Sequence, residues 1–352
     1  MEFRPPFCPN TDCKQHLNPG IRFWIFFGFF KPSSRPERVQ RFRCKTCRIT
    51  FSKPTFCLDY WDQRPELNQR LFENLVSGVG YRQTARTVHA AVSSLQYKAR
   101  KLAAHAGLLH HNLSPRLPAD RTFLLDEEET YEQASIRTLT MPVLMEREHW
   151  FVVATDVGTT RRLAASDSKR REWQEREELE SGPRPDQSRE CVTTVLKELD
   201  RRLDGAKLTL QTDLKGSYAT IASEVFGDRV THETTSGKLP RTTFNPLFPI
   251  NTTLAMTRDN LGRLRRKSWL VTKKREWLQS HMNLFLAYRN YVRVRFNRDK
   301  DGESPAVKLQ LLDRNLTVAE ALGWRQDWGP RSIHPLSADG RRFIGTPVTA
   351  SA

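Results

Sequence analysis

The spacing of apolar residues changes near residue 120, and the change divides the chain into a helical part and a part with strands. In the first part, apolar residues recur every three or four positions. This spacing predicts helices over 65–76, 81–89 and 95–105, followed by a linker over 113–120 that contains two prolines.

Short apolar runs beyond the linker predict strands, and longer amphipathic runs predict helices. The predicted strands are 121–126, 139–145, 149–156, 207–213 and 229–233. The predicted helices are 190–203, 218–226 and a basic stretch over 251–291. This order of elements is that of an α/β ribonuclease H-like domain, in which helices flank a mixed sheet, and we expect that domain over 119–298.

Two stretches are too polar to contribute much to a core. Residues 166–188 are highly charged, and we expect them to form an insertion that projects into solvent. Residues 299–352 form a polar, basic C-terminal tail with scattered Gly and Pro, for which we expect only partial order.

Two pairs of cysteines lie within the first 47 residues. Cys8 and Cys13 form one pair, and Cys44 and Cys47 form the other. Four thiolates in two tight pairs can surround one tetrahedral zinc ion, so we expect a small zinc ribbon over 1–57. The alternatives are a disulfide or incidental thiols. With six cysteines in 352 residues, the pattern favours a reducing cytoplasm over a secreted disulfide scaffold.

Charge points to the class of partner. The chain has 57 Lys and Arg against 40 Asp and Glu, a net charge of +17 and a pI near 9.9. A polyanion is the expected partner, with DNA or RNA first. A membrane surface is the alternative, but no apolar run reaches the roughly 18 residues that a spanning helix needs.

The helices over 62–112 have the layout of a helix-turn-helix DNA-binding domain. The last helix would enter the major groove. The residues that would then lie near DNA are Gln96, Lys98, Arg100 and Lys101. The alternative is a helical linker without a binding role.

Two predicted strands end on carboxylates. Asp126 ends the first strand and Asp213 ends the fourth, and these strands are neighbours in the expected sheet. Hard oxygen ligands of this kind hold Mg²⁺ or Mn²⁺, and a pair of ions roughly 3.5–4 Å apart can clamp one phosphate for transfer. Asp at a strand end is also ordinary turn chemistry. On a strand, Glu128 would share the face of Asp126 and could assist it.

These features together resemble a bacterial insertion-sequence transposase, most closely the family of insertion sequence one. The resemblance covers nearly all of residues 5–300. It is carried by the motifs RCKTCRITFS at 43–52, LDEEETY at 125–131, TDLKGSY at 212–218 and RLRRKSW at 263–269. Family members use an Asp-Asp-Glu triad, so the resemblance makes Asp126 and Asp213 the first two catalytic acids and magnesium ligands.

The third acid departs from the family pattern. The pattern leads to Asn251, where a Glu is expected. Asn251 would bind Mg²⁺ weakly through its amide oxygen, or a displaced acid such as Asp259 or Glu233 would substitute, or the chain binds DNA without cutting it.

Basic residues around these motifs are candidates for phosphate contacts. In the zinc ribbon they are Arg43, Lys45 and Arg48. Near the third acid they are Arg258, Arg263, Arg265, Arg266, Lys267, Lys273, Lys274 and Arg275. A charge run is more often a solvated helix face, which is the alternative here.

The leading hypothesis is a cytoplasmic DNA transposase that binds terminal inverted repeats and joins them to target double-stranded DNA with Mg²⁺ or Mn²⁺. It would act as a homodimer or a larger oligomer, because two ends must be paired. The second hypothesis is a non-catalytic, sequence-specific DNA-binding protein derived from a transposase, and Asn251 motivates it. An RNA-binding zinc protein fits the charge but explains neither the helices nor the paired aspartates.

Overall fold

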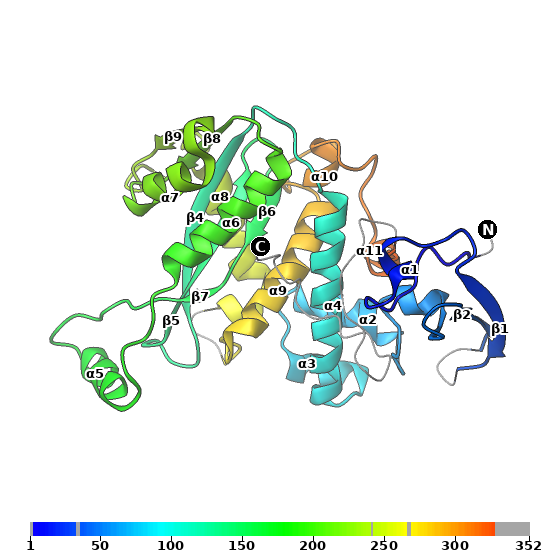
Figure 1. Cartoon of the computed structure of the whole chain (residues 1–352). Coiled ribbons are helices and arrows are strands. Elements are labelled where there is room, and N and C mark those ends of the chain that lie inside the picture. Colours follow the sequence, from blue (N-terminus) through cyan, green and yellow to red (C-terminus); the bar gives the residue numbers. More distant parts are fainter. Residues whose placement is uncertain (1–2, 33–35, 241, 266–268, 328–352) are drawn as a thin grey trace. The chain divides into compact units, whose positions relative to one another are not determined.

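The computed structural model describes residues 3–32, 36–240, 242–265 and 269–327, and the chain divides into two compact units (Figure 1). The first unit comprises Met1–Glu73, Tyr81–Leu113 and Leu316–Ala352. The second comprises Asn74–Gly80 and Ser114–Asn315. Each unit is a separate cluster of contacts.

The cysteine-rich start of the first unit folds around a small antiparallel sheet. Its elements are α1 (Lys14–Leu17), β1 (Trp24–Phe30), β2 (Val39–Cys44), β3 (Thr50–Ser52) and the 3-10 turn η1 (Lys53–Phe56). The core of this sheet is aromatic and consists of Phe7, Phe23, Phe42, Phe51 and Phe56 together with the buried cysteines. A core this small gives limited stability without a further crosslink.

The helices of the first unit follow the predicted apolar spacing. They are α2 (Leu67–Leu75), α3 (Tyr81–Val88) and α4 (Val92–Leu113), and α11 (Val318–Gly323) packs on α4. Helix α4 begins before and ends after the predicted range of 95–105. Its buried apolar residues continue as far as Leu109, which explains the later end.

The C-terminal tail was expected to be only partly ordered, but it carries packed structure as far as residue 327. In the second unit, α10 (Pro305–Lys308) buries Ala306. In the first unit, a capping box between Thr317 and Glu320 starts α11, and the carbonyl of Ala321 lies 2.9 Å from Nε2 of His105. Buried Ala and Trp side chains in this polar stretch explain the order.

The second unit contains a mixed sheet. Its strands are β4 (Thr122–Tyr131), β5 (Thr138–Glu146), β6 (Val152–Thr155), β7 (Gly158–Thr159), β8 (Leu208–Thr212) and β9 (Val230–Thr234). Their order is β6-β5-β4-β8-β9, with β7 paired to β5. The pairs β4–β5 and β5–β6 are antiparallel, whereas β4–β8 and β8–β9 are parallel.

Helices flank this sheet on both faces, so β5 is buried along its whole length. The helices α6 (Ser188–Leu203) and α7 (Ser217–Phe226) pack together, and α6 covers β5 and β6. The other face carries α8 (Phe248–Asn260) and α9 (Arg275–Ala287), and Figure 1 shows α6 in front of the sheet and α8 behind it. Within the charged insertion, α5 (Lys169–Ser181) is mostly exposed. In the described part of the chain, no helix is both long and apolar enough to cross a membrane.

A buried ion pair ties α4 to the segment before α2. Nζ of Lys98 donates to a carboxylate oxygen of Asp62, to the carbonyl of Arg64 at 2.7 Å and to Oδ1 of Asn68 at 3.2 Å. Burial alone would raise the pKa of Asp62, but the hydrogen bonds from Lys98 and Asn68 and the charge of Lys98 outweigh it and lower that pKa below 3.8. The positive charge of Lys98 therefore compensates the negative charge of the buried Asp62 carboxylate.

Replacing Lys98 by Met should lower the free energy of unfolding by about 3–5 kcal/mol, because Asp62 would remain as an uncompensated buried charge. Since the native pair holds the pKa of Asp62 below its unfolded value, its stabilisation is present at neutral pH and is lost as pH falls through the lowered pKa. The deficit of Lys98→Met should therefore be largest at neutral pH and shrink in acid, as urea titrations at several pH values would measure.

The exposed Arg100 on the same helix provides the control. Arg100→Gln should change the free energy of unfolding by no more than about 0.5 kcal/mol. Equal losses in Lys98→Met and Arg100→Gln would contradict a specific role of the buried pair.

Candidate functional site

The four N-terminal cysteines converge on one point. Cys8 and Cys13 lie in the loop that leads into α1, Cys44 ends β2, and Cys47 lies in the turn that follows. The Sγ atoms of Cys8 and Cys47 are 3.6 Å apart, those of Cys13 and Cys44 are 3.8 Å apart, and all four lie within 4.8 Å of one another. A tetrahedral zinc ion with Zn–S bonds of about 2.3 Å requires sulfur separations of about 3.8 Å. The donor set therefore fits zinc.

The same distances exclude disulfides in this arrangement, since a disulfide needs an S–S distance of about 2.05 Å. Burial and the neighbouring thiol of Cys47 raise the pKa of Cys8, and burial also raises that of Cys13. Burial acts in the same direction on Cys44, but backbone N–H groups of Cys47 and Thr46 lower its pKa overall. Four thiolates at this spacing require a cation between them.

The two predicted acids are brought together by the parallel pairing of β4 with β8. Leu125 pairs with Thr212 in that register, so the next residues along the two strands are Asp126 and Asp213. The negative charge of Asp213 is close enough to act on the pKa of Asp126. The two acids lie on adjacent strands, as predicted. The prediction that Asp126 ends its strand is wrong, because β4 continues to Tyr131.

Asp126 lies on the face of the sheet that α8 and α9 cover. It pairs across the strands with Val143, which belongs to the same core cluster as Ile250 and Leu254 of α8. Glu128 shares that face, and its buried carboxylate lies 3.5 Å from Nη2 of Arg258 on α8. Glu128 therefore pairs with a cation from α8.

Asn251 and Asp259 occupy different positions on α8. Asn251 is half-buried, and seven residues separate it from Arg258, so the two lie about 20° apart around the helix. Asp259 is exposed and lies about 80° from Asn251. Asn251 therefore shares the side of α8 from which the Arg258 side chain extends to Glu128 of β4. Glu233 lies on β9, two strands from β4, and accepts a hydrogen bond of 2.6 Å from Gln211.

The environment of Asp126 disfavours its charge. Burial is the main cause that raises its pKa to about 6, and the carboxylates of Asp213, Glu127 and Glu128 act in the same direction. The backbone N–H of Glu127 donates to Asp126 at 2.7 Å and opposes the shift. A carboxylate that is poorly compensated by protein groups has capacity for a cation.

A second group of polar side chains lies on the opposite face of β4. Glu127 accepts hydrogen bonds from the Tyr218 hydroxyl at 2.7 Å and from Thr140 Oγ1 at 2.6 Å, and it pairs with Lys215. Burial and the nearby carboxylates raise the pKa of Tyr218, so its hydroxyl keeps its proton and donates. Sequence reasoning missed this group, although Lys215 and Tyr218 follow Asp213 in the motif at 212–218.

The basic residues predicted for DNA differ in where their charges point. Lys45 and Arg48 are exposed, whereas the guanidinium of Arg43 lies 3.4 Å from the ring centroid of Phe27. On α4, Lys98 and Lys101 turn inwards, and Lys101 donates to the carbonyl of Tyr60 at 2.6 Å.

The outer face of α4 carries Arg100, which is exposed, and Gln96, which is half-buried. Tyr97 on this face is 57% exposed, and sequence reasoning did not single it out. The exposed side chains of α4 in this region therefore lie on this face, whereas Lys98 and Lys101 are engaged inside the unit.

The basic segment after α8 is partly held by the protein itself. The guanidinium of Arg263 lies 5.9 Å from the ring centroid of Trp277, and Arg265 donates to the carbonyl of Asp259 at 3.2 Å. Arg266 and Lys267 lie outside the described residues.

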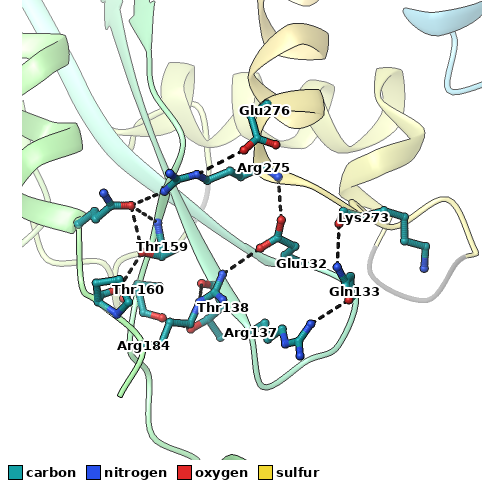
Figure 2. A network of polar contacts seen from close by, with 12 residues as sticks. Glu132, Gln133, Arg137, Thr138, Thr159, Thr160, Arg184, Lys273, Arg275 and Glu276 are labelled. Carbon is teal, nitrogen blue, oxygen red and sulfur yellow. Dashed lines mark hydrogen bonds and ion pairs between the residues drawn. The ribbon is translucent and has the colours of Figure 1, made fainter. Parts of the chain in front are cut away.

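The end of this segment is anchored to the turn between β4 and β5. Figure 2 shows Glu132 between Arg184 and Arg275, and its carboxylate accepts the backbone N–H of Arg275 at 2.9 Å and Nη2 of Arg184 at 3.2 Å. The backbone N–H of Gln133 donates to the backbone carbonyl of Thr272 at 2.7 Å. Nη1 of Arg275 donates to Gln187 at 2.6 Å, so this guanidinium is engaged inside the unit.

Comparisons with known proteins add little to this geometry. No family model and no curated protein matches the chain. Among solved structures, a chain in a cryoEM structure of the simian T-cell lymphotropic virus intasome in complex with PP2A regulatory subunit B56 gamma is similar. It is 9% identical, with 68% of this chain and 71% of that chain covered and a TM-score of 0.30. A TM-score this low does not establish a shared fold.

Cys44→Ser should abolish zinc binding and unfold the small sheet, because structural zinc contributes about 10–16 kcal/mol to such modules. Cys57→Ser is the matched control, since Cys57 lies outside the cluster and donates to the carbonyl of Lys53. Atomic emission should find about one zinc ion per chain in the native protein and in Cys57→Ser. Full zinc content in Cys44→Ser would rule out the tetrahedral site.

Asp213→Asn should lower the pKa of Asp126 from about 6 towards its ordinary value, because it removes one neighbouring negative charge. Since the folded pKa is above the unfolded value of 3.8, ionisation of Asp126 reduces stability as pH rises between the two values. A divalent cation bound at Asp126 would offset this loss of stability, and in that case Mg²⁺ should raise the melting temperature more above pH 6 than in acid. Carboxyl NMR titration and thermal melts measure both effects.

Asp228→Asn, which changes an exposed carboxylate of the same unit, should leave the Asp126 titration and the Mg²⁺ effect unchanged. An Asp126 pKa that does not move in Asp213→Asn would mean that the two carboxylates do not interact.

Proposed function

We propose that this chain is a DNA transposase of the insertion sequence one type, which binds the ends of its element and carries out metal-dependent phosphoryl transfer there. One observation carries the proposal: Asp126 and Asp213 are neighbours on parallel strands, beside the sheet face that α8 covers. Adjacent carboxylates with little protein compensation are suited to hold divalent ions against a phosphate.

The arrangement of strands supports a ribonuclease H-like architecture for the second unit. In that architecture the first strand is central, antiparallel to the second strand and parallel to the fourth. The strands β4, β5 and β8 are related in this way. The prediction from element order and the register of the sheet are therefore consistent with the same architecture.

The residues would have distinct roles in the reaction. Mg²⁺ or Mn²⁺, when bound, would activate the attacking oxygen and stabilise the leaving oxygen. Asp126 and Asp213 would hold the ions, and Asn251 would supply a neutral amide oxygen from α8. Arg258 would remain with Glu128 and so keep α8 in register with β4.

We favour Asn251 over Asp259 as the third ligand. Asn251 shares the stripe of Arg258, which contacts β4, whereas Asp259 is exposed on another side of α8. A neutral ligand lowers the affinity for Mg²⁺ relative to a carboxylate, because it adds no charge attraction. We therefore expect an enzyme that needs high concentrations of metal.

Double-stranded DNA is the proposed partner, and three regions would contact it. Lys45 and Arg48 of the zinc module and Arg263 and Arg265 after α8 offer cations. A turn of a few residues after Val88 joins α3 to α4, which supports a helix-turn-helix with Gln96, Tyr97 and Arg100 towards DNA. Two protomers are needed to pair two ends.

Asn251 also supports a second function. Without a third carboxylate, the same chain would act as a non-catalytic DNA-binding protein derived from a transposase. That protein would bind DNA in a salt-dependent manner and would leave it uncut with any metal.

The two functions separate in a nicking and joining assay on DNA that carries the flanking ends of the element, with Mn²⁺ or Mg²⁺. For a transposase, Asp126→Asn and Asp213→Asn should each reduce cleavage at least about 100-fold, or about 2.7 kcal/mol, while DNA binding persists. Asn251→Glu should lower the Mg²⁺ concentration needed for activity, because it adds the missing charge.

Asp259→Asn is the matched control on α8 and should leave cleavage unchanged. Loss of activity in Asp259→Asn with normal activity in Asn251→Ala would instead make Asp259 the third ligand. Absence of cleavage in the native chain and in Asn251→Glu, with DNA binding intact, would favour the non-catalytic protein.

A further inference from the structure

The β1–β2 hairpin of the zinc module exposes apolar side chains that its own core does not need. Strand β1 reads WIFFGFF and lies at the edge of its sheet. Ile25 is 40% exposed, Phe29 58% and Phe30 38%. Large apolar residues that are this exposed and this close together mark an interaction surface.

One face of the hairpin combines these apolar residues with arginines. Arg43 pairs directly across the strands with Ile25. The guanidinium of Arg43 lies 3.4 Å from the ring centroid of Phe27, and that of Arg41 lies 5.1 Å from the same ring and 6.0 Å from Phe30. We name Ile25, Phe27, Phe30, Arg41 and Arg43 the Phe–Arg face.

The other face adjoins the core of the module through Phe42, although Phe26 and Phe29 on that face are each 58% exposed. Phe26 pairs with Phe42, and Phe42 packs on Phe51. The register shift between Phe26 and Phe29 puts Phe29 opposite Gln40, on the side of Phe42. Phe29 and Phe30 are thus adjacent in sequence but lie on opposite faces.

The arginines of the Phe–Arg face lack acidic partners. Within the described part of the chain, neither Arg41 nor Arg43 pairs with a carboxylate, and the Nε atoms of both are shielded from solvent without a hydrogen-bond partner. Residues 1–57 contain eleven Lys or Arg and three Asp or Glu. A second copy of this hairpin would be repelled by that charge, whereas a polyanion would be attracted.

We propose that the Phe–Arg face binds single-stranded DNA, with bases on the aromatic rings and phosphates on the arginines. Aromatic rings next to cations on an open sheet are suited to unstacked bases, which are sequence-tolerant partners. In a duplex the flat faces of the bases are covered by their neighbours, so rings on this face would have nothing to stack on. This inference rests on the proposed function, which makes DNA the polyanion.

The test measures binding of the full-length, zinc-loaded chain to a dye-labelled oligothymidine of about 16 nucleotides by fluorescence anisotropy, without Mg²⁺. Phe30→Ala should weaken this binding about fivefold or more, which corresponds to the loss of about 1 kcal/mol of stacking. Binding to a duplex of the same length should be unchanged. Phe29→Ala is the matched control, since it removes the neighbouring ring from the opposite face.

A second pair of variants tests the arginines. Arg41→Gln should reduce the slope of log affinity against log salt by about 0.7, the value for one phosphate contact of a single strand. Lys45→Gln removes an equal charge from an exposed position outside the face and should affect single-stranded and duplex DNA alike. Zinc content must stay unchanged in every variant, and Phe30→Leu, which keeps apolar bulk without the ring, replaces Phe30→Ala if zinc is lost.

Several outcomes would overturn the inference. If Phe29→Ala and Phe30→Ala weaken single-strand binding equally, the binding site is not confined to the Phe–Arg face. Tighter binding to oligouridine than to oligothymidine would assign the face to RNA. Self-association that Phe30→Ala abolishes would make a second copy the occupant. If the chain does not bind single strands but still binds and cleaves duplex DNA, this inference is refuted and the proposed function stands. If it binds single strands but does not cleave DNA, this inference stands and the proposed transposase activity is refuted.

Discussion

The parallel pairing of β4 with β8 is the constraint on which the second unit depends. It joins the antiparallel half of the sheet to the parallel half, and it makes Asp126 and Asp213 neighbours. This arrangement puts several carboxylates on a largely buried strand, where their loss of hydration is unfavourable. On one face of β4, Lys215 and Tyr218 compensate the charge of Glu127, and on the other face Arg258 compensates that of Glu128. Asp126 pairs with no cation of its own among the described residues, and this is the feature on which the proposed metal site rests.

Local patterns in the sequence predicted much of this arrangement. The strands, the flanking helices and the converging cysteines follow from apolar period, turn residues and ligand spacing. The length of β4 did not follow, because three consecutive glutamates look incompatible with a buried strand. Their partners, such as Thr140 and Arg162, come from elements that are distant in sequence, and a local pattern cannot show them.

The basic residues also show that local sequence patterns do not reveal contacts between residues that are distant in sequence. Periodicity puts Lys98 on one side of α4, and a lysine there is normally expected to be exposed. Its inward position depends on Asp62, 36 residues earlier, whose buried carboxylate requires compensation. Likewise, the aromatic run of β1 does not show by itself which rings share a face. Only the register with β2 separates Phe29, on the side of Phe42, from Phe30, on the side of Arg41.

The network around Glu132 also has a mechanical consequence (Figure 2). It fastens the residues just before α9 to the turn that follows β4, through the backbone of Thr272 and Arg275. The backbone just before α9 is therefore clamped to the end of the sheet, so a displacement of the first turn of α9 would act directly on β4, the strand that carries Asp126.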